Sequence, residues 1–234
     1  MTREDLIAKN ASIVQQVGEG IREYAPNSII IMVTNPLDLM TYHMQKVTGF
    51  PAHRVCGQAG VLDSARMTHF VAEAVGCSEE DVQAMVLGGH GDTMVPLPRL
   101  TKISGKPLLD LVKEGKISSE KLESINQRTR DGGAEIVKYL EKGSAFYAPA
   151  ASGIQMAEAY LQDKKLTLPC AVKLDGQYGF KDVYAGVPVI IGSKGVEKIV
   201  EIELNDQEKK EFIHSVDSVK KLWDAATKID PDLK

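Results

Sequence analysis

A histidine in a glycine-rich segment is the residue of this sequence best suited to acid–base chemistry. His90 lies in the run Gly88-Gly89-His90-Gly91, and the glycines predict an irregular, exposed connection along which the backbone can pass close to a ligand. An imidazole titrates near neutral pH, so His90 could donate or accept a proton there. The alternative, a histidine that serves only as a turn residue, stays open on this run alone.

An acidic and a basic residue three positions apart could complete such a site. Asp63 and Arg66 would share one face of a helix at this spacing. A carboxylate can orient an imidazole, and a guanidinium can bind a substrate carboxylate through two parallel hydrogen bonds. The same spacing is typical of a solvated ion pair, and this alternative also stays open.

The composition is that of an ordinary globular protein. Of the 234 residues, 43% are hydrophobic and 26% are charged, which allows a real core and one or two domains. The formal net charge of −4 favours neither nucleic acid nor an anionic membrane as partner. Cys56, Cys77 and Cys170 show no C-x-x-C spacing, so we expect no disulfide framework and no zinc site. A charged N-terminal segment and the lack of a long apolar run predict a cytoplasmic protein.

The elements that must position these residues begin with an α/β unit. Apolar residues at helical spacing predict a first helix capped at Thr2. The β-branched run over residues 28–33 predicts a buried strand of a parallel sheet, and residues 37–47 predict a helix. Asn35 lies between them in an Asn-Pro turn, so it would stand at the carboxyl end of the strand, where parallel sheets bind ligands.

The remainder predicts a mixture of helices and antiparallel strands. Helices are expected over residues 63–75 with a stop at Gly76, and over residues 149–161 and 206–228. A further long helix is expected to follow Ser118 and Ser119 and to run to about Leu140, with a weak point at Gly132 and Gly133. Strands are expected over residues 82–87 and, as an antiparallel sheet, over residues 166–174, 187–191 and 196–203. Residues 94–103 contain two prolines and are expected to be irregular or an edge strand.

Three segments, in this order, resemble the lactate and malate dehydrogenase family. They are Val33-Thr34-Asn35-Pro36, Leu62-Asp63-Ser64-Ala65-Arg66 and Gly89-His90-Gly91-Asp92, each weak alone and specific together. Residues 94–99 and 144–150 are similar to the bacterial lactate-dehydrogenase-like malate dehydrogenases in particular. The resemblance runs from Met1 to the C-terminal helix. It implies an α/β fold with an incomplete Rossmann-type nucleotide-binding domain over residues 1–58, followed by an α+β catalytic domain over residues 59–234.

The resemblance also implies a role for each candidate side chain near the substrate. His90 would exchange a proton with the substrate's 2-oxygen, and Asp63 would hold the tautomer of His90 and stabilise the imidazolium. Arg66 would bind the C1 carboxylate. Arg3 would polarise the 2-oxo group, and Asn35 would hydrogen-bond substrate near the nicotinamide.

The cofactor implied by the resemblance is NAD, and no metal is implied. Asn10, Val33, Thr34 and Asn35 would contact NAD, which supplies the hydride chemistry. A family dehydrogenase opens with a strand, a G-x-G-x-x-G phosphate turn and a helix, whereas this sequence has only the echo Gly18-Glu19-Gly20. By the family's usual length we expect about the first quarter of the enzyme to be missing. The missing part would include the arginine that distinguishes malate from lactate enzymes.

The resemblance therefore predicts an NAD-dependent malate dehydrogenase, present as an N-terminally truncated chain that is inactive or nearly so by itself. Its partners would be a small 2-oxo or 2-hydroxy acid and further copies of the chain, in a dimer or tetramer, with no nucleic acid and no membrane. Two alternatives stay open: specificity for lactate or another 2-hydroxy acid, and a non-catalytic relic that serves as an oligomerisation or interaction module. A hydrolase using His90 and Asp63 is disfavoured, because no G-x-S-x-G turn is present.

Overall fold

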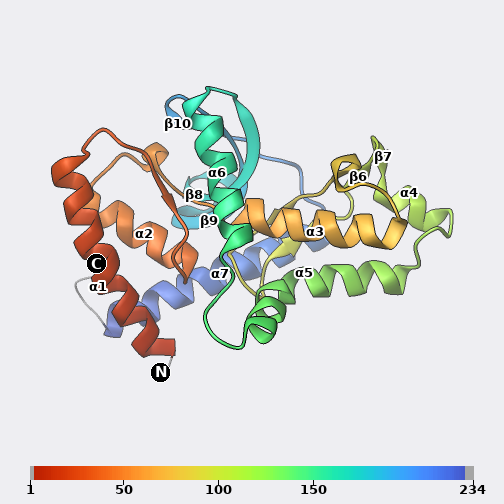
Figure 1. Cartoon of the computed structure of the whole chain (residues 1–234), viewed down its shortest axis with the longest axis horizontal. Helices are drawn as coiled ribbons and strands as arrows, with labels where there is room; N and C mark the ends of the chain where they lie inside the picture. The colour runs from red at the N-terminus through yellow and green to blue at the C-terminus, as the bar shows by residue number, and fades with distance from the viewer. Residues whose placement is uncertain (1–2, 230–234) are drawn as a thin grey trace.

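The structure, a computed structural model, describes residues 3–229 and the side chains of residues 7–228. A five-stranded sheet occupies the middle of the molecule, with α1 and α2 at one end and α3, α4 and α5 at the other (Figure 1). The order of its strands is β1-β2-β8-β9-β10. The sheet therefore joins strands from the first 60 residues to strands from the last third of the chain.

The N-terminal elements follow the predicted α/β unit. They are α1 (Arg3–Tyr24), β1 (Ile30–Met32), α2 (Leu37–Thr48), the 3-10 turn η1 (Ala52–Arg54) and β2 (Val55–Gly57). Strand β1 pairs with β2 in parallel, which confirms the predicted parallel strand, although β1 is only three residues long. The predicted cap at Thr2 lies outside the described residues.

The predicted antiparallel strands form the other side of the same sheet. They are β8 (Leu166–Asp175), β9 (Lys181–Gly192) and β10 (Gly195–Ile199), so β9 begins earlier and β10 ends earlier than expected. The parallel and antiparallel parts meet where Gly57 of β2 pairs with Ala171 of β8. A side chain at Gly57 would lie 2.9 Å from Leu37 and Thr41, because α2 packs directly over this joint.

Two long helices pack side by side beyond the sheet (Figure 1). Helix α3 (Ala59–Val75) ends at Gly76, whose left-handed conformation (φ 74°) and N–H bond to Ala72 confirm the predicted stop. Helix α5 (Ser119–Leu140) begins with the Ser118 hydroxyl accepting a hydrogen bond from the Lys121 N–H. It runs without interruption through Gly132 and Gly133, so the weak point predicted there is wrong.

The single strand predicted over residues 82–87 is also wrong. Two short strands lie there, and they pair with different partners. β3 (Val82–Gln83) pairs with β6 (Lys102–Ile103), which pairs with β7 (Lys106–Pro107), while β4 (Val86–Leu87) pairs with β5 (Val95–Pro96). The change of partner falls at Met85, whose carbonyl accepts the Leu97 N–H. The 3-10 turn η2 (Glu79–Asp81) precedes β3, and the short helix α4 (Leu108–Lys113) follows β7.

The last two helices cover the sheet. Helix α6 (Tyr147–Leu161) packs on α3 and β9, and α7 (Asp206–Ile229) reaches from β9 to α1 and α2. On α7, Phe212 and Val216 lie in the core with the β8–β9 hairpin, and the Trp223 ring stacks on Tyr42 with centroids 4.3 Å apart. Helix α7 therefore ties the sheet to α1 and α2.

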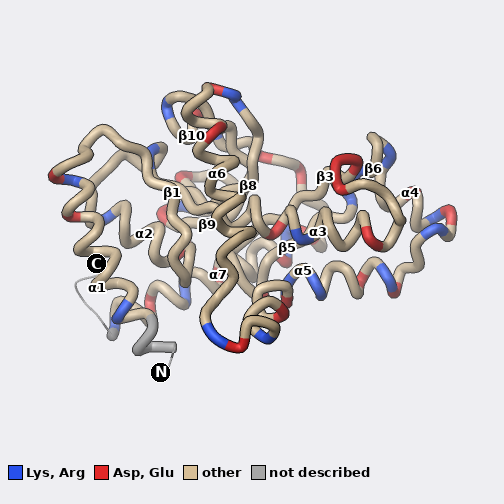
Figure 2. Tube along the Cα trace, viewed as in Figure 1, with Lys and Arg blue, Asp and Glu red and all other residues tan. Residues whose placement is uncertain are grey.

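The surface carries both signs of charge. Basic and acidic residues are interspersed along the trace of α5 and around the turns next to β10 (Figure 2). No helix within residues 3–229 is long and apolar enough to cross a membrane.

Candidate active site

The His90 loop, residues 88–92, is fixed by elements remote in the sequence. Gly88 and Gly186 of β9 exchange two backbone hydrogen bonds of 2.9 Å. The next amide, that of Gly89, donates to the Ser215 hydroxyl of α7 over 2.9 Å. Gly88 has a φ of 88°, and a side chain there would lie 2.5 Å from the Ser215 oxygen. The glycines that predicted an exposed connection are thus needed for close packing on β9 and α7.

The imidazole of His90 is oriented by Asp63 on α3. The His90 Nδ1 lies 2.9 Å from Asp63 Oδ2, and the two side chains are 15% and 3% exposed. Because a carboxylate can only accept, Nδ1 carries the hydrogen and Nε2 is left for another partner. Burial lowers the pKa of His90, but the charge and hydrogen bond of Asp63, together with the charge of Asp38, outweigh burial and raise the pKa above its usual value. The imidazole is therefore poised to hold a proton that it can give up.

Arg66 completes this group from the next turn of α3. Its Nη1 donates to Asp63 Oδ1 over 3.2 Å, and its side chain is 13% exposed. A side chain at Gly132 of α5 would lie 2.9 Å from Arg66 Cδ. The absence of a side chain at Gly132 therefore makes room for Arg66, which explains a glycine in the middle of α5.

One cavity collects most of the predicted site residues. Its volume is about 610 Å³, and its walls come from α1, the end of β1, α3, α5 and the segment joining α5 to α6. Six of the predicted residues line it: Asn10, Val33, Thr34, Asn35, Arg66 and His90. Asp63 lies behind His90 rather than in the wall. Arg3 belongs to α1, but its side chain lies outside the described side chains.

The part of the cavity at the end of β1 has the character expected of a nicotinamide site. The Asn10 side chain donates to the Asn35 carbonyl over 2.7 Å, which braces the segment after β1. Val33 is 45% exposed and offers an apolar surface to a flat ring. Gln58 also lines the cavity, and its buried Oε1 has no hydrogen-bond partner within the described part of the chain. An unpaired acceptor beside an apolar surface fits an amide-bearing ring.

No metal site accompanies these residues. Within the described residues, no group of three or more His, Cys, Asp and Glu side chains is arranged to hold a metal ion.

Sequence reasoning missed Asp38, Gln58 and Ser215. Asp38 follows the Asn-Pro turn closely and could have been noted as an acidic residue in the first turn of a helix. No local pattern links Asp38 to His90, although its carboxylate accepts a hydrogen bond from the His90 N–H, 52 positions away. Gln58 and Ser215 carried no signal, since their importance comes only from what the fold places beside them.

Comparisons with known proteins give the relationship directly. The family profile for the lactate/malate dehydrogenase NAD binding domain matches residues 1–57, and that for the alpha/beta C-terminal domain of the same family matches residues 60–229. The malate dehydrogenase of Pelagibacter ubique (strain HTCC1062) is 66% identical over 233 residues, which are 100% of this chain and 73% of that protein.

Solved structures agree with the family match. The malate dehydrogenase of Cryptosporidium parvum superposes with a TM-score of 0.95 at 46% identity, covering 97% of this chain and 73% of that one. The lactate dehydrogenase of Cryptosporidium parvum, complexed with lactic acid and NAD, has a TM-score of 0.93 at 44% identity, covering 96% and 71%. The predicted fold class is confirmed, and with two family profiles covering almost the whole chain, the protein belongs to the lactate/malate dehydrogenase family.

Proposed function

We propose that this chain carries the catalytic part of an NAD-dependent malate dehydrogenase, which converts malate and NAD to oxaloacetate, NADH and a proton. The observation that carries the proposal is the Asp63–His90 hydrogen bond of 2.9 Å with Arg66 beside it at one cavity. The 66% identity to a malate dehydrogenase supports the choice of substrate.

The proton step falls to His90. In the reduction of oxaloacetate, the protonated imidazole gives the Nε2 proton to the substrate's 2-oxygen, and in the oxidation of malate the neutral imidazole accepts it from the hydroxyl. Asp63 keeps Nδ1 protonated and faces the positive charge through both directions of the reaction. The hydride chemistry at the substrate's C2 would be supplied by NAD when it is bound.

Substrate orientation falls to the side chains around His90. Arg66 binds the C1 carboxylate through two parallel hydrogen bonds, in the space that Gly132 leaves beside α5. Asn35, at the end of β1, hydrogen-bonds the substrate near the nicotinamide. Arg3 polarises the 2-oxo group from the start of α1. Together, these three side chains would hold the 2-oxygen within reach of His90.

NAD would be held at the end of β1 by Asn10, Val33, Thr34 and Asn35, which all line the cavity. These residues serve the nicotinamide end of the dinucleotide. The sequence contains no G-x-G-x-x-G turn for the pyrophosphate. We therefore expect the 234-residue chain by itself to bind NADH weakly and to be inactive or nearly so.

The test is a fluorescence titration of the purified chain with NADH, followed by oxaloacetate reduction with His90→Asn as control. We expect a Kd of about 1 mM or weaker, close to −4 kcal/mol, and slow turnover at saturating NADH that His90→Asn abolishes. The absence of any His90-dependent turnover at NADH concentrations where binding is detected would favour the non-catalytic module instead. A preference for pyruvate over oxaloacetate would assign the site to lactate.

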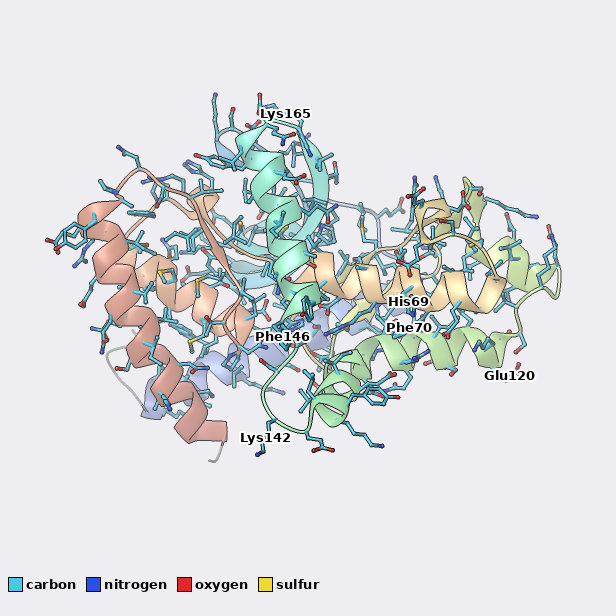
Figure 3. The ribbon with its side chains drawn as sticks, in the orientation of Figure 1. His69, Phe70, Glu120, Lys142, Phe146 and Lys165 are labelled. Atoms are coloured by element: carbon cyan, nitrogen blue, oxygen red, sulfur yellow. The ribbon has the colours of Figure 1, made fainter. Side chains whose placement is uncertain are left out.

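Assembly into dimers or tetramers is part of the proposal. Helix α6 leaves three large apolar side chains on one face, with Tyr147 83%, Ile154 59% and Leu161 76% exposed. Beside the start of α6 lies a cavity of about 540 Å³, to which Phe146 and, from α3, His69 and Phe70 contribute (Figure 3). Sedimentation of the chain over a range of concentrations tests for association.

The proposal also includes a division of the chain into two domains and a location in the cell. We assign residues 1–58 to the nucleotide-binding domain and residues 59–234 to the catalytic domain, in line with the residues that the two family profiles match. A cytoplasmic location is supported by the free thiols of Cys56, Cys77 and Cys170.

A further inference from the structure

A buried carboxylate that the proposed reaction does not use lies directly behind the His90 loop. Asp38, in the first turn of α2, is 5% exposed. Its Oδ2 accepts the backbone N–H of His90 over 2.8 Å. Its other oxygen, Oδ1, has no hydrogen-bond partner in any other residue that the structure describes. A carboxylate buried with a hydrogen bond from only one other described residue is costly, so its presence calls for a reason.

The need for a hydrogen-bond acceptor at the His90 amide does not by itself explain a charged residue at position 38. The neighbouring amide, that of Gly89, is satisfied by the neutral hydroxyl of Ser215. The loop packs closely on both groups, since a side chain at Gly89 would lie 3.4 Å from Asp38 Oδ2 and 3.7 Å from Ser215 Oγ. One of two adjacent amides is therefore held by a neutral group and the other by an acid. The difference between them is the charge.

We propose that Asp38 is a positioning residue for His90: it holds the loop by the His90 amide, and its buried negative charge stabilises the protonated imidazole. The inference rests on the role of His90 in the proposed function. It adds a second acid, on a different helix, to the one that binds the ring directly. The imidazole would then be held between Asp63 on its Nδ1 side and Asp38 on its backbone side.

The surrounding charges are consistent with this role. On the side of α3, Asp63 and Arg66 act on His90 with opposite signs. Asp38 itself borders a separate cavity of about 260 Å³. The titratable and charged groups that line this cavity with Asp38 are Tyr42 of α2, Asp182 and Tyr184 of β9, and Lys220 and Asp224 of α7.

The proton affinity of Asp38 connects it to His90. Burial raises the pKa of Asp38 to about 6, although the His90 amide and the charge of His90 lower it. Asp38 is therefore anionic at neutral pH and becomes neutral only slightly below it. Because the charge of each group acts on the pKa of the other, the two titrate as a coupled pair. When Asp38 takes up its proton, the support for the imidazolium falls.

The experiment is an NMR titration of the imidazole nitrogens of the full 234-residue chain, with neither cofactor nor substrate. His90 is identified by the signal that His90→Gln removes. In the unmodified chain we expect the His90 signal to show a second inflection near pH 6, from Asp38. In Asp38→Asn, which keeps an acceptor for the amide, the second inflection should disappear. The proton affinity of His90 should also fall about ten-fold, since one opposite charge is lost at short range.

Ser215→Ala is the matched control, because it removes the adjacent loop hydrogen bond without changing a charge. We expect its His90 titration to match that of the unmodified chain. The proposal is overturned if Asp38→Asn leaves the His90 midpoint unchanged, or if Ser215→Ala moves it as far. A His90 midpoint in the unmodified chain that is not above the usual value of an imidazole also overturns it, and this readout does not depend on the folding of any variant. Since no turnover is measured, failure of the proposed activity would not be confused with failure of this proposal.

Discussion

The His90 loop and the α1–β1 region face the same cavity but differ in how their backbones are supported. Two consecutive residues of the loop, Gly88 and Gly89, donate their amides to β9 and α7. By contrast, β1 is the edge of the sheet, and the segment after it leaves Val33 45% exposed. On α1, Gly18 packs against α2, whereas a side chain at Gly20 would meet nothing within 4 Å.

The two regions therefore differ in how closely neighbouring elements pack around the residues that line the cavity. The groups proposed to move the proton are enclosed by elements from all parts of the described chain, and substitutions there should be felt strongly. The groups proposed to hold NAD stand on an open edge, where the backbone has fewer neighbours. Three predictions test this contrast.

The largest effect is expected for Gly186→Ala. The added Cβ would lie 2.5 Å from the Gly88 carbonyl oxygen, so β9 and the His90 loop must separate and weaken two backbone hydrogen bonds. We expect a loss of about 3 kcal/mol or more in the free energy of unfolding, measured by urea denaturation.

The matched substitution in the open region is Gly20→Ala. It lies inside α1 with free space around it, so the higher helix propensity of alanine should stabilise the chain by up to about 1 kcal/mol. Similar losses for both variants would contradict the contrast between the two regions.

The second prediction concerns pH. The pKa of Asp38 rises on folding from 3.8 to about 6 because of burial, so its contribution to stability is present at acid pH and is lost as the pH rises through 6. Relative to Asp38→Asn, the unmodified chain should lose about 1 kcal/mol between pH 5 and pH 7.5. The raised pKa of His90 acts in the same direction. Urea denaturation of both proteins at the two pH values measures the difference, and parallel pH profiles would show that Asp38 titrates normally.

The smallest effect is expected at the contact between α5 and Arg66. Gly133→Ala should stabilise α5 by up to about 1 kcal/mol, since the nearest Arg66 atom lies 3.8 Å from the added Cβ. Gly132→Ala should gain less, because its Cβ would lie 2.9 Å from Arg66 Cδ and must displace the side chain. The Arg66 Nε signal in an NMR spectrum should shift in the second variant alone. Equal shifts in both would mean that Gly132 has no special role.

The sequence predicted the elements whose signals are local. Helices α2, α3, α5 and α7 follow from apolar periodicity, and the end of α3 follows from Gly76. Residues 82–87 were mistaken for one strand because the partners of β3 and β4 lie elsewhere in the chain. Periodicity cannot show a change of partner.

The site residues also divide into those with a local signal in the sequence and those without one. The motifs around Asn35, Asp63 and His90 predicted residues that the fold does bring together. Gly132 was interpreted as a helix weakness because the reason for it, Arg66, lies 66 positions earlier and on another helix. Asp38 was missed because nothing near it in the sequence indicates that it will be buried or will accept the His90 amide.

The joint at Gly57 and Ala171 has a consequence for the order in which the protein opens. Strands β8 and β9 share ten registered pairs, while β1 and β2 share three and are attached to the hairpin through a single pair. Amide hydrogens in the hairpin should exchange with solvent only through global unfolding, whereas those of β1 and β2 exchange through smaller openings that leave the hairpin intact. A dinucleotide bound at the end of β1 would slow exchange in the very strands that open most easily, and the free energy used for that ordering would be subtracted from its affinity.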